Sequence, residues 1–208
     1  MTSPDNSPEP TYDDRVYRSP SALVGGVALL VLAGWLGGDA VVRGTGRVPW
    51  LALAGLLCVV PLLIAFTLRP AVFAGAERLR IRNPFRVITL PWGAVEDVRA
   101  SYTSEVFTDS DKYQLWSIPV SLRARKKASR KAARAAVEDF SNRTSVSPDV
   151  TDAARRAPAD QAVAELRELA ERHRSDEAAQ GQPEVRWSYE VIVPSVVGLV
   201  LFVVLAVI

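Results

Sequence analysis

The sequence VPWLALAGLLCVVPLLIAFTL, residues 48–68, is an apolar run of 21 residues in which Cys58 has the only ionisable side chain. A helix of about 20 apolar residues is long enough to cross the hydrocarbon core of a bilayer, which is roughly 30 Å thick. In that layer the backbone must satisfy its own hydrogen bonds, and a helix does so within a single segment. Residues 48–68 therefore predict a transmembrane helix.

Two further runs have the same character. Residues 21–36 are apolar and continue through two glycines towards Val42, and residues 191–208 are 18 residues without a charge. The first two runs predict a helical hairpin, and the last predicts a third span. Residues 1–20 are acidic and rich in proline and serine, which predicts a disordered tail. A cleaved signal peptide would begin with a short basic segment instead.

Basic residues near the ends of the apolar runs predict the orientation of the chain. Arg15 and Arg18 precede the first run, and five more arginines lie within residues 69–86. Only Arg43 and Arg47 lie in the connection between the first two runs. Lys and Arg concentrate in cytoplasmic loops. We therefore expect a multi-pass protein of the inner membrane, with its N-terminus and its central polar segment in the cytoplasm.

The polar segment begins with short strands. Residues 78–82 (RLRIR) alternate between arginine and an apolar residue, which is the period-two pattern of a strand with one wet face. Further strand-like pieces follow at residues 86–90, 95–102 and 112–123, separated by turn residues. Residues 159–174 then place their apolar side chains on one stripe of a helix. Several strands followed by one amphipathic helix predict a small barrel or sheet that the helix caps.

Three phrases of this segment carry a resemblance to a known family. They are GAERLRIRN at residues 75–83, ITLPW at residues 88–92 with Val95 and Val98 after it, and AVAELR at residues 162–167. Together they resemble the bacterial pleckstrin-homology-like (PH-like) domains, in particular the actinobacterial low-molecular-weight protein antigen PH-like family. The resemblance spans roughly residues 69–174 and implies a binding domain, without naming its ligand. An insertion at residues 124–157 and the third span depart from the pattern.

The expected fold class is an α+β membrane protein, with three transmembrane helices and a small PH-like β-barrel or sheet capped by an amphipathic helix. Its parts are a tail (1–20), a transmembrane hairpin (21–68), a cytoplasmic PH-like domain (69–175) with a basic and loop insertion (124–157), a linker (176–188) and a C-terminal transmembrane helix (189–208). Trp92 and Trp116 are expected to pack in the core of the PH-like domain, and the alternative is that they line a pocket.

Charge is distributed unevenly over the polar segment. Residues 69–134 carry 14 Lys and Arg against 6 Asp and Glu, whereas residues 135–190 carry 7 against 12. A basic residue close to an anionic membrane surface contributes about 1 kcal/mol of attraction. The candidate residues for binding a lipid or a partner are therefore Arg78, Arg80, Arg82, Arg123, Arg125, Lys126, Lys127, Arg130, Lys131 and Arg134. The simpler interpretation is a solvated basic face that only follows the positive-inside bias.

The sequence offers no motif for catalysis, and we expect a protein that is not an enzyme. It has no P-loop, no dinucleotide-binding glycine pattern and no nucleophile motif. One cysteine and one histidine give no metal-binding spacing, so we expect neither a metal nor a cofactor. Nucleic acid is not expected as a partner, because no recognition motif accompanies the basic charge.

The predicted partners are the lipid bilayer itself and either anionic lipid headgroups or an acidic protein segment. The predicted function is that of a non-enzymatic binding or adaptor module at the cytoplasmic face of the membrane. The main alternative is a structural subunit of a larger membrane assembly. An accessory of a transporter is a weaker alternative, because the spans contain no buried charge of the kind that marks an ion path.

Overall fold

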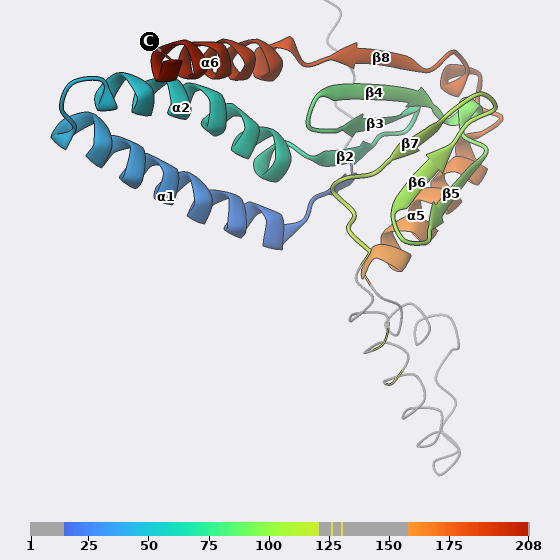
Figure 1. Ribbon diagram of the computed structural model, residues 1–208. Helices are drawn as coiled ribbons and strands as arrows, with labels where there is room; N and C mark the ends of the chain where they lie inside the picture. Colours follow the sequence, from blue (N-terminus) through green and yellow to red (C-terminus); the bar gives the residue numbers. More distant parts are fainter. Residues whose placement is uncertain (1–14, 121–125, 127–129, 131–157, 208) are drawn as a thin grey trace, which may run out of the picture.

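The computed structural model describes residues 15–120, 126, 130 and 158–207. It contains three apolar helices: α1 (Pro20–Arg43), α2 (Val48–Leu63), which continues as the π-helical turn η1 (Ile64–Leu68), and α6 (Tyr189–Val207). All three are long and apolar enough to cross a membrane, as the sequence predicted. They extend together from one side of a β-rich domain, with α2 between α1 and α6 (Figure 1).

Glycines allow the apolar helices to pack closely. Gly198 of α6 lies directly against the backbone of α2, where a Cβ atom would come within 2.8 Å of Cys58 Cα. Gly37 of α1 likewise lies against the side chain of Leu56. Small residues at such contacts let two helix backbones approach, which favours association of helices in an apolar environment.

The domain contains two antiparallel sheets. The larger has the strand order β1-β2-β3-β4-β8, formed by β1 (Arg15–Tyr17), β2 (Ala71–Ala74), β3 (Arg78–Arg82), β4 (Arg86–Pro91) and β8 (Glu184–Trp187). The smaller has the order β5-β6-β7, formed by β5 (Asp97–Ala100), β6 (Ser104–Phe107) and β7 (Lys112–Gln114). In the described part of the chain the two sheets are not joined by strand pairing, so of the expected barrel or sheet the structure has open sheets and no closed barrel.

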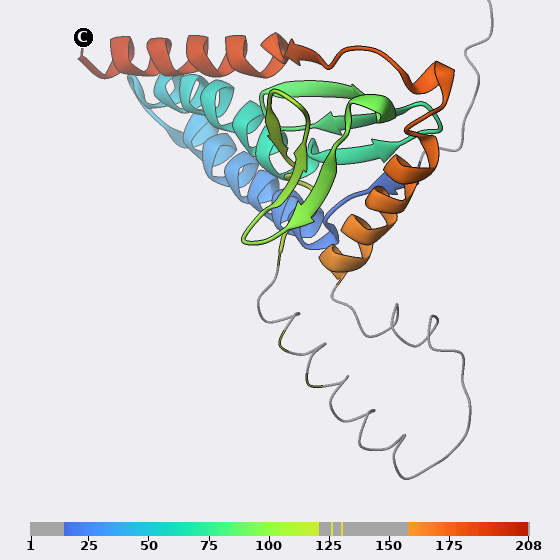
Figure 2. The ribbon, with the colours of Figure 1, turned by 90° about the vertical axis from the view of Figure 1, so that its right-hand side faces the viewer.

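The core lies between the two sheets and the helix α5 (Pro158–His173), which confirms the predicted amphipathic helix (Figure 2). On β3 the side chains of Leu79 and Ile81 are fully buried, as the alternating pattern predicted. Trp92 of the short helix η2 (Trp92–Ala94) is also fully buried, and its indole nitrogen donates a 2.9 Å hydrogen bond to the Gly75 carbonyl. The prediction for Trp116 was wrong: its side chain is exposed outside the core, because its ring packs beside Phe66 of η1, 5.6 Å away between ring centres.

Three segments differ from the sequence predictions. Residues 15–17, expected in a disordered tail, form the edge strand β1, and residues 184–187, expected in a linker, form the opposite edge strand β8. Each is short and pairs with a strand far away in the sequence: Tyr17 lies opposite Val72. Of the strand expected at residues 112–123, residues 112–114 form β7 and residues 115–120 are not in a strand, because the chain turns there; residues 121–123 lie outside the described residues.

Three strands of the larger sheet, the edge strands β1 and β8 and the inner strand β2, attach the domain to the apolar helices. Two residues join β1 to α1, two join η1 to β2, and Ser188 alone joins β8 to α6. A short helix, η3 (Glu177–Ala179), precedes β8. Because none of these connections is long enough to act as a flexible tether, the orientation of the sheet follows that of the helices.

Tyr17 ties the edge strand β1 to α5, because its hydroxyl donates a 2.7 Å hydrogen bond to Glu165 Oε2. Tyr17→Phe is therefore expected to lower the free energy of unfolding by about 1 kcal/mol. Burial, followed by the hydrogen bond to Glu165, raises the pKa of Tyr17 from 10.0 to about 12. Since the unfolded chain loses this proton first, the contribution of Tyr17 is present below pH 10 and disappears as the pH rises towards 12.

Chemical denaturation of the purified protein at neutral pH would measure this loss. Tyr102→Phe is the matched control, since the side chain of Tyr102 is 89% exposed. Equal stability of the Tyr17→Phe variant and the wild type would contradict a role for this bond in holding β1.

Candidate functional site

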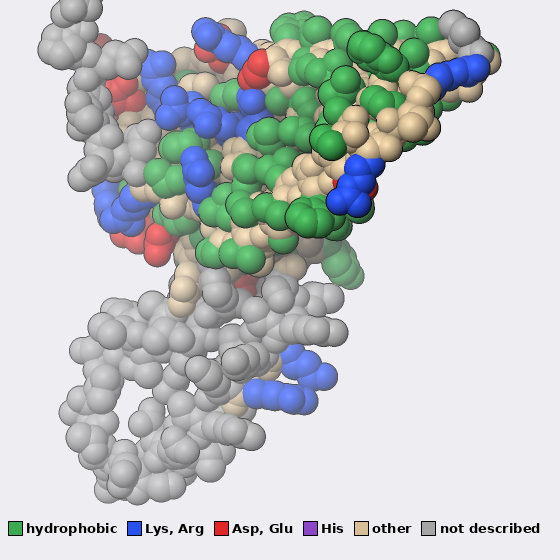
Figure 3. Space-filling view, turned by 90° about the vertical axis from the view of Figure 1, so that its left-hand side faces the viewer, with side chains coloured by type: hydrophobic (Ala, Val, Ile, Leu, Met, Phe, Trp, Pro, Cys, Tyr) green, Lys and Arg blue, Asp and Glu red, His purple; other side chains and the backbone are tan. Residues whose placement is uncertain are grey.

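Arginines gather where the three apolar helices meet the larger sheet. Arg18 lies between β1 and α1, Arg69 lies between η1 and β2, and Arg82 is the last residue of β3. Seen from the side of the helices, Lys and Arg side chains form a group beside the broad apolar surface (Figure 3). We call Arg18, Arg69, Arg80 and Arg82 the junction arginines.

The outer face of β3 supplies two of the junction arginines. Because Leu79 and Ile81 point into the core, the arginines between them project from the opposite face. Phe73 lies opposite Arg80 on β2, and the guanidinium carbons of Arg80 and Arg82 lie 4.7 and 5.3 Å from the centre of its ring. This cation–π stacking holds the two guanidinium groups side by side.

Arg69 connects the end of the second apolar helix to the start of the third. Its Nη1 atom lies 2.8 Å from Glu190 Oε1, and its Nη2 atom donates a hydrogen bond to Ser188 Oγ. The side chain is only 15% exposed, and its buried Nε atom has no hydrogen-bond partner among the described residues. The positive charge of Arg69 therefore stays at the junction in a largely desolvated position.

Positive charge exceeds negative charge around Arg82. Burial, followed by repulsion from Arg69, Arg80 and Arg18, lowers the pKa of Arg82, and Glu190 opposes this effect only weakly. The guanidinium nevertheless remains protonated at neutral pH. None of the salt bridges between described residues includes Arg82. An anion bound here would relieve the repulsion between the junction arginines.

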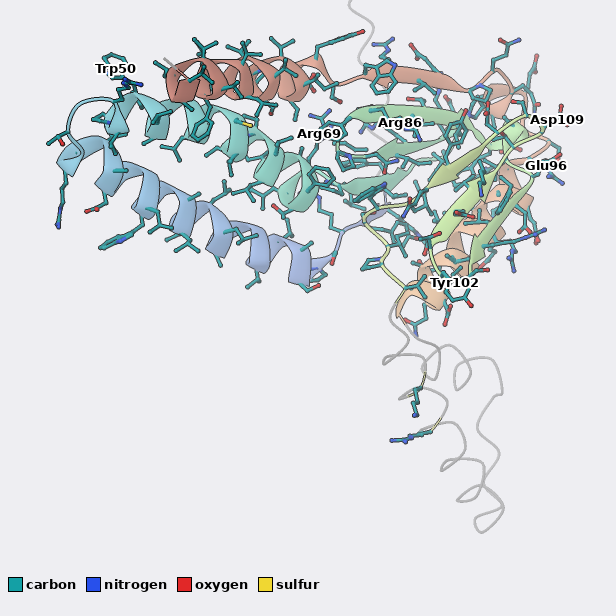
Figure 4. All side chains as sticks on the ribbon, viewed as in Figure 1. Trp50, Arg69, Arg86, Glu96, Tyr102 and Asp109 are labelled. Carbon is teal, nitrogen blue, oxygen red and sulfur yellow. The ribbon has the colours of Figure 1, made fainter. Side chains whose placement is uncertain are left out.

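An aromatic cluster packs the sheet against the helices beside the junction arginines. Phe66 of η1 makes an edge-to-face contact with Phe85, at 5.3 Å between ring centres, in the turn between β3 and β4. This turn therefore points towards the helices. Figure 4 shows Arg69 at the end of α2, and Arg86, the first residue of β4, farther into the domain over the sheet.

Only some of the predicted binding residues can be placed. Arg80 and Arg82 lie together at the junction, whereas Arg78 is at the other end of β3, 3.8 Å from Glu77. Lys126 and Arg130 are exposed. Arg123, Arg125, Lys127, Lys131 and Arg134 lie outside the described residues.

Sequence reasoning counted Arg18 and Arg69 only as evidence for orientation and did not propose them as binding residues. The available signal was their position at the borders of two apolar runs. As for metals, no group of three His, Cys, Asp or Glu side chains within the described residues could hold an ion.

Comparison with known families agrees with this architecture. Residues 69–143, about a third of the chain, match the family model of the bacterial PH domain. Residues 69–143 are therefore a bacterial PH-like domain, as the resemblance predicted, while membership of the actinobacterial family remains a prediction. The match includes β2 to β7, whereas β1, β8, α5 and the apolar helices lie outside it. No curated protein and no solved structure matches the chain.

Proposed function

We propose that this protein is embedded in the inner membrane by its three apolar helices and holds a PH-like domain at the cytoplasmic face. There the domain acts as a non-enzymatic module that binds anionic phospholipid headgroups. The observation that carries the proposal is the crowding of Arg18, Arg69 and Arg82 at the level where the helices enter the domain.

The position of the junction arginines explains why the expected ligand is a headgroup. If α1, α2 and α6 cross the bilayer, their ends at the domain lie in the headgroup layer, where a basic residue contributes about 1 kcal/mol of attraction to anionic lipid. The three short connections keep the arginines at this depth. Recruitment to the membrane therefore cannot be the regulated step, and lipid binding would instead set the orientation of the domain or expose a surface to a protein.

The opposite end of the hairpin supports the proposed orientation. There, Arg43 lies 3.0 Å from Asp39, so that a carboxylate offsets part of its charge. The end that joins the domain carries more positive charge, which is the distribution expected for the cytoplasmic side.

Arg82→Gln should weaken binding of anionic lipid by about fivefold, which corresponds to about 1 kcal/mol for one basic residue. The full-length protein in detergent would be titrated with short-chain phosphatidylglycerol or phosphatidylcholine, and the shift of its thermal midpoint would report binding. The wild type should be stabilised more by the anionic lipid. Combining Arg82→Gln with Arg18→Gln should weaken the response further, and added salt should reduce it.

Arg99→Gln is the matched control, because Arg99 also lies on a strand and stacks over a phenylalanine, 5.1 Å from the centre of the Phe107 ring. Its strand, β5, belongs to the other sheet. If the control weakens the response as much as Arg82→Gln does, or if both lipids stabilise the wild type equally, the junction arginines are not a headgroup site. The alternative of a structural subunit would then be favoured.

A further inference from the structure

The outer face of the larger sheet, opposite the core, is basic and open to solvent. β3 contributes Arg78, Arg80 and Arg82 to this face, and the first two are exposed. On the edge strand β1, Val16 lies opposite Phe73, in the same row as Arg80, and is 50% exposed. The face therefore extends from the junction arginines to the edge of the sheet at β1.

The sequence directly before β1 is acidic. Residues 1–14, which we call the acidic segment, contain no Lys, Arg or His and four acidic residues: Asp5, Glu9, Asp13 and Asp14. The segment joins β1 at Arg15, which lies opposite Ala74, at the end of β2 farther from the apolar helices. A chain of one charge is thus attached to the edge of a sheet face of the opposite charge.

The acidic segment is long enough to reach the junction arginines. From Arg15 to Arg82 the path crosses two strand spacings and runs three residues back towards the helices, which places the two about 14 Å apart along the sheet. Six extended residues span about 20 Å. Glu9, which is six residues before Arg15, can therefore lie over Arg80 and Arg82.

The junction arginines have positive charge that the described carboxylates leave unmatched. None of the salt bridges between described residues includes Arg18 or Arg82. Glu190, which lies near Arg82, is already paired with Arg69 at 2.8 Å. Carboxylates of the acidic segment would supply the missing negative charge, as an anionic headgroup would.

We propose that the acidic segment binds the outer face of the sheet at Arg80 and Arg82 through its carboxylates and competes there with anionic headgroups. The inference rests on the proposed function, because it assigns a regulator to the same arginines. A segment attached to the sheet has a high effective concentration at its site. Headgroups therefore displace it only where anionic lipid is dense, so the domain responds to the density of anionic lipid.

A nitroxide label on the acidic segment tests the contact directly and without lipid. In the full-length Cys58→Ser protein, Ser7→Cys provides a single labelling site, because Cys58 is the only cysteine of the chain. The label should broaden the NMR signals of the Arg80 and Arg82 amides and leave the signal of Arg99, on the smaller sheet, unchanged. High salt should remove the broadening, because it screens the attraction.

Two results of this measurement would overturn the proposal. One is the absence of broadening along β3. The other is broadening that persists after the four acids of the segment are replaced by Asn and Gln, since the contact would then not depend on their charge.

The lipid titration described above measures the competition. Replacing the four acids of the segment by Asn and Gln should strengthen binding of short-chain phosphatidylglycerol by about fivefold, the effect of about two surface ion pairs. In a protein that also carries Arg80→Gln and Arg82→Gln, the same replacement should have no further effect.

The matched control neutralises four exposed acids away from this face, which changes the net charge by the same amount. They are Glu96, Asp109, Glu171 and Glu177. Figure 4 shows Glu96 and Asp109 at the side of the domain far from the apolar helices. The control should change the response to phosphatidylglycerol little.

The outcomes separate this proposal from the proposed function. If neutralising the segment leaves lipid binding unchanged, or if the control strengthens it equally, the competition is overturned even where Arg82→Gln still weakens lipid binding. Broadening along β3 in a protein that responds equally to phosphatidylglycerol and phosphatidylcholine would instead support the contact of the segment and remove the headgroup function.

Discussion

Replacing Trp92 by alanine is expected to lower the free energy of unfolding by about 3–5 kcal/mol, the range for truncating a large aromatic side chain in a packed core. Trp92 is the largest of the fully buried side chains, and its indole nitrogen also satisfies the Gly75 carbonyl at 2.9 Å. The substitution leaves a cavity between the sheets and removes the partner of a backbone oxygen. The cavity and the lost hydrogen bond both destabilise the folded state.

Denaturation of the full-length protein in detergent, followed by tryptophan fluorescence and near-ultraviolet circular dichroism, would measure the change. Trp116→Ala serves as a comparison because Trp116 is partly exposed, and it should cost clearly less. Tyr102→Ala, at a side chain that projects into solvent, should have almost no effect (Figure 4). A loss for Trp92→Ala no larger than that for Trp116→Ala would contradict the placement of Trp92 at the centre of the core.

Gly198→Ala should separate α6 from α2 and destabilise the apolar helices by about 1–3 kcal/mol, the usual cost of overpacking. An added Cβ atom would lie within 2.8 Å of backbone atoms of Cys58, which cannot rotate away as a side chain could. The displacement would also reach the sheet, because Ser188 alone separates α6 from β8. We therefore expect a lower thermal midpoint and weaker protection of the β8 amides against hydrogen exchange.

Gly34→Ala is the control for this prediction. It is the same substitution in another apolar helix, at a position where an added Cβ atom meets nothing within 4 Å. Its thermal midpoint should equal or exceed that of the wild type, because alanine favours a helix more than glycine does. If both variants were equally stable, close contact between α6 and α2 would not contribute to stability.

The elements that could be predicted are those whose signal lies within one continuous segment. Residues 48–68 reveal an apolar helix by composition alone, and the alternation in residues 78–82 identifies β3 together with its exposed arginine face. The stripe on residues 159–174 likewise identifies α5. In each case the pattern of apolar residues along the segment indicates which side chains are buried, without knowledge of a distant partner.

The edge strands could not be predicted, because their signal does not lie within one continuous segment. β1 and β8 are three and four residues long; β8 has all four of its residues exposed and β1 has only Tyr17 partly buried, so neither is long enough to show an alternating pattern. β1 is a strand because it hydrogen-bonds to β2, which follows the apolar hairpin in the sequence. β8 is a strand because it hydrogen-bonds to β4, and α5 lies between these two strands in the sequence.

The same distinction applies to the candidate site. Charge counting drew attention to the basic half of the polar segment, because net charge depends only on composition. It could not bring Arg18 to Arg69 and Arg82, since the apolar hairpin separates Arg18 from the other two in the chain and the three meet only where β1, β2 and β3 pair. The outer face of the sheet likewise combines residues of β1, β2 and β3. Local periodicity is a property of a segment, whereas a site built from several segments exists only once pairing and packing have set the distances between them.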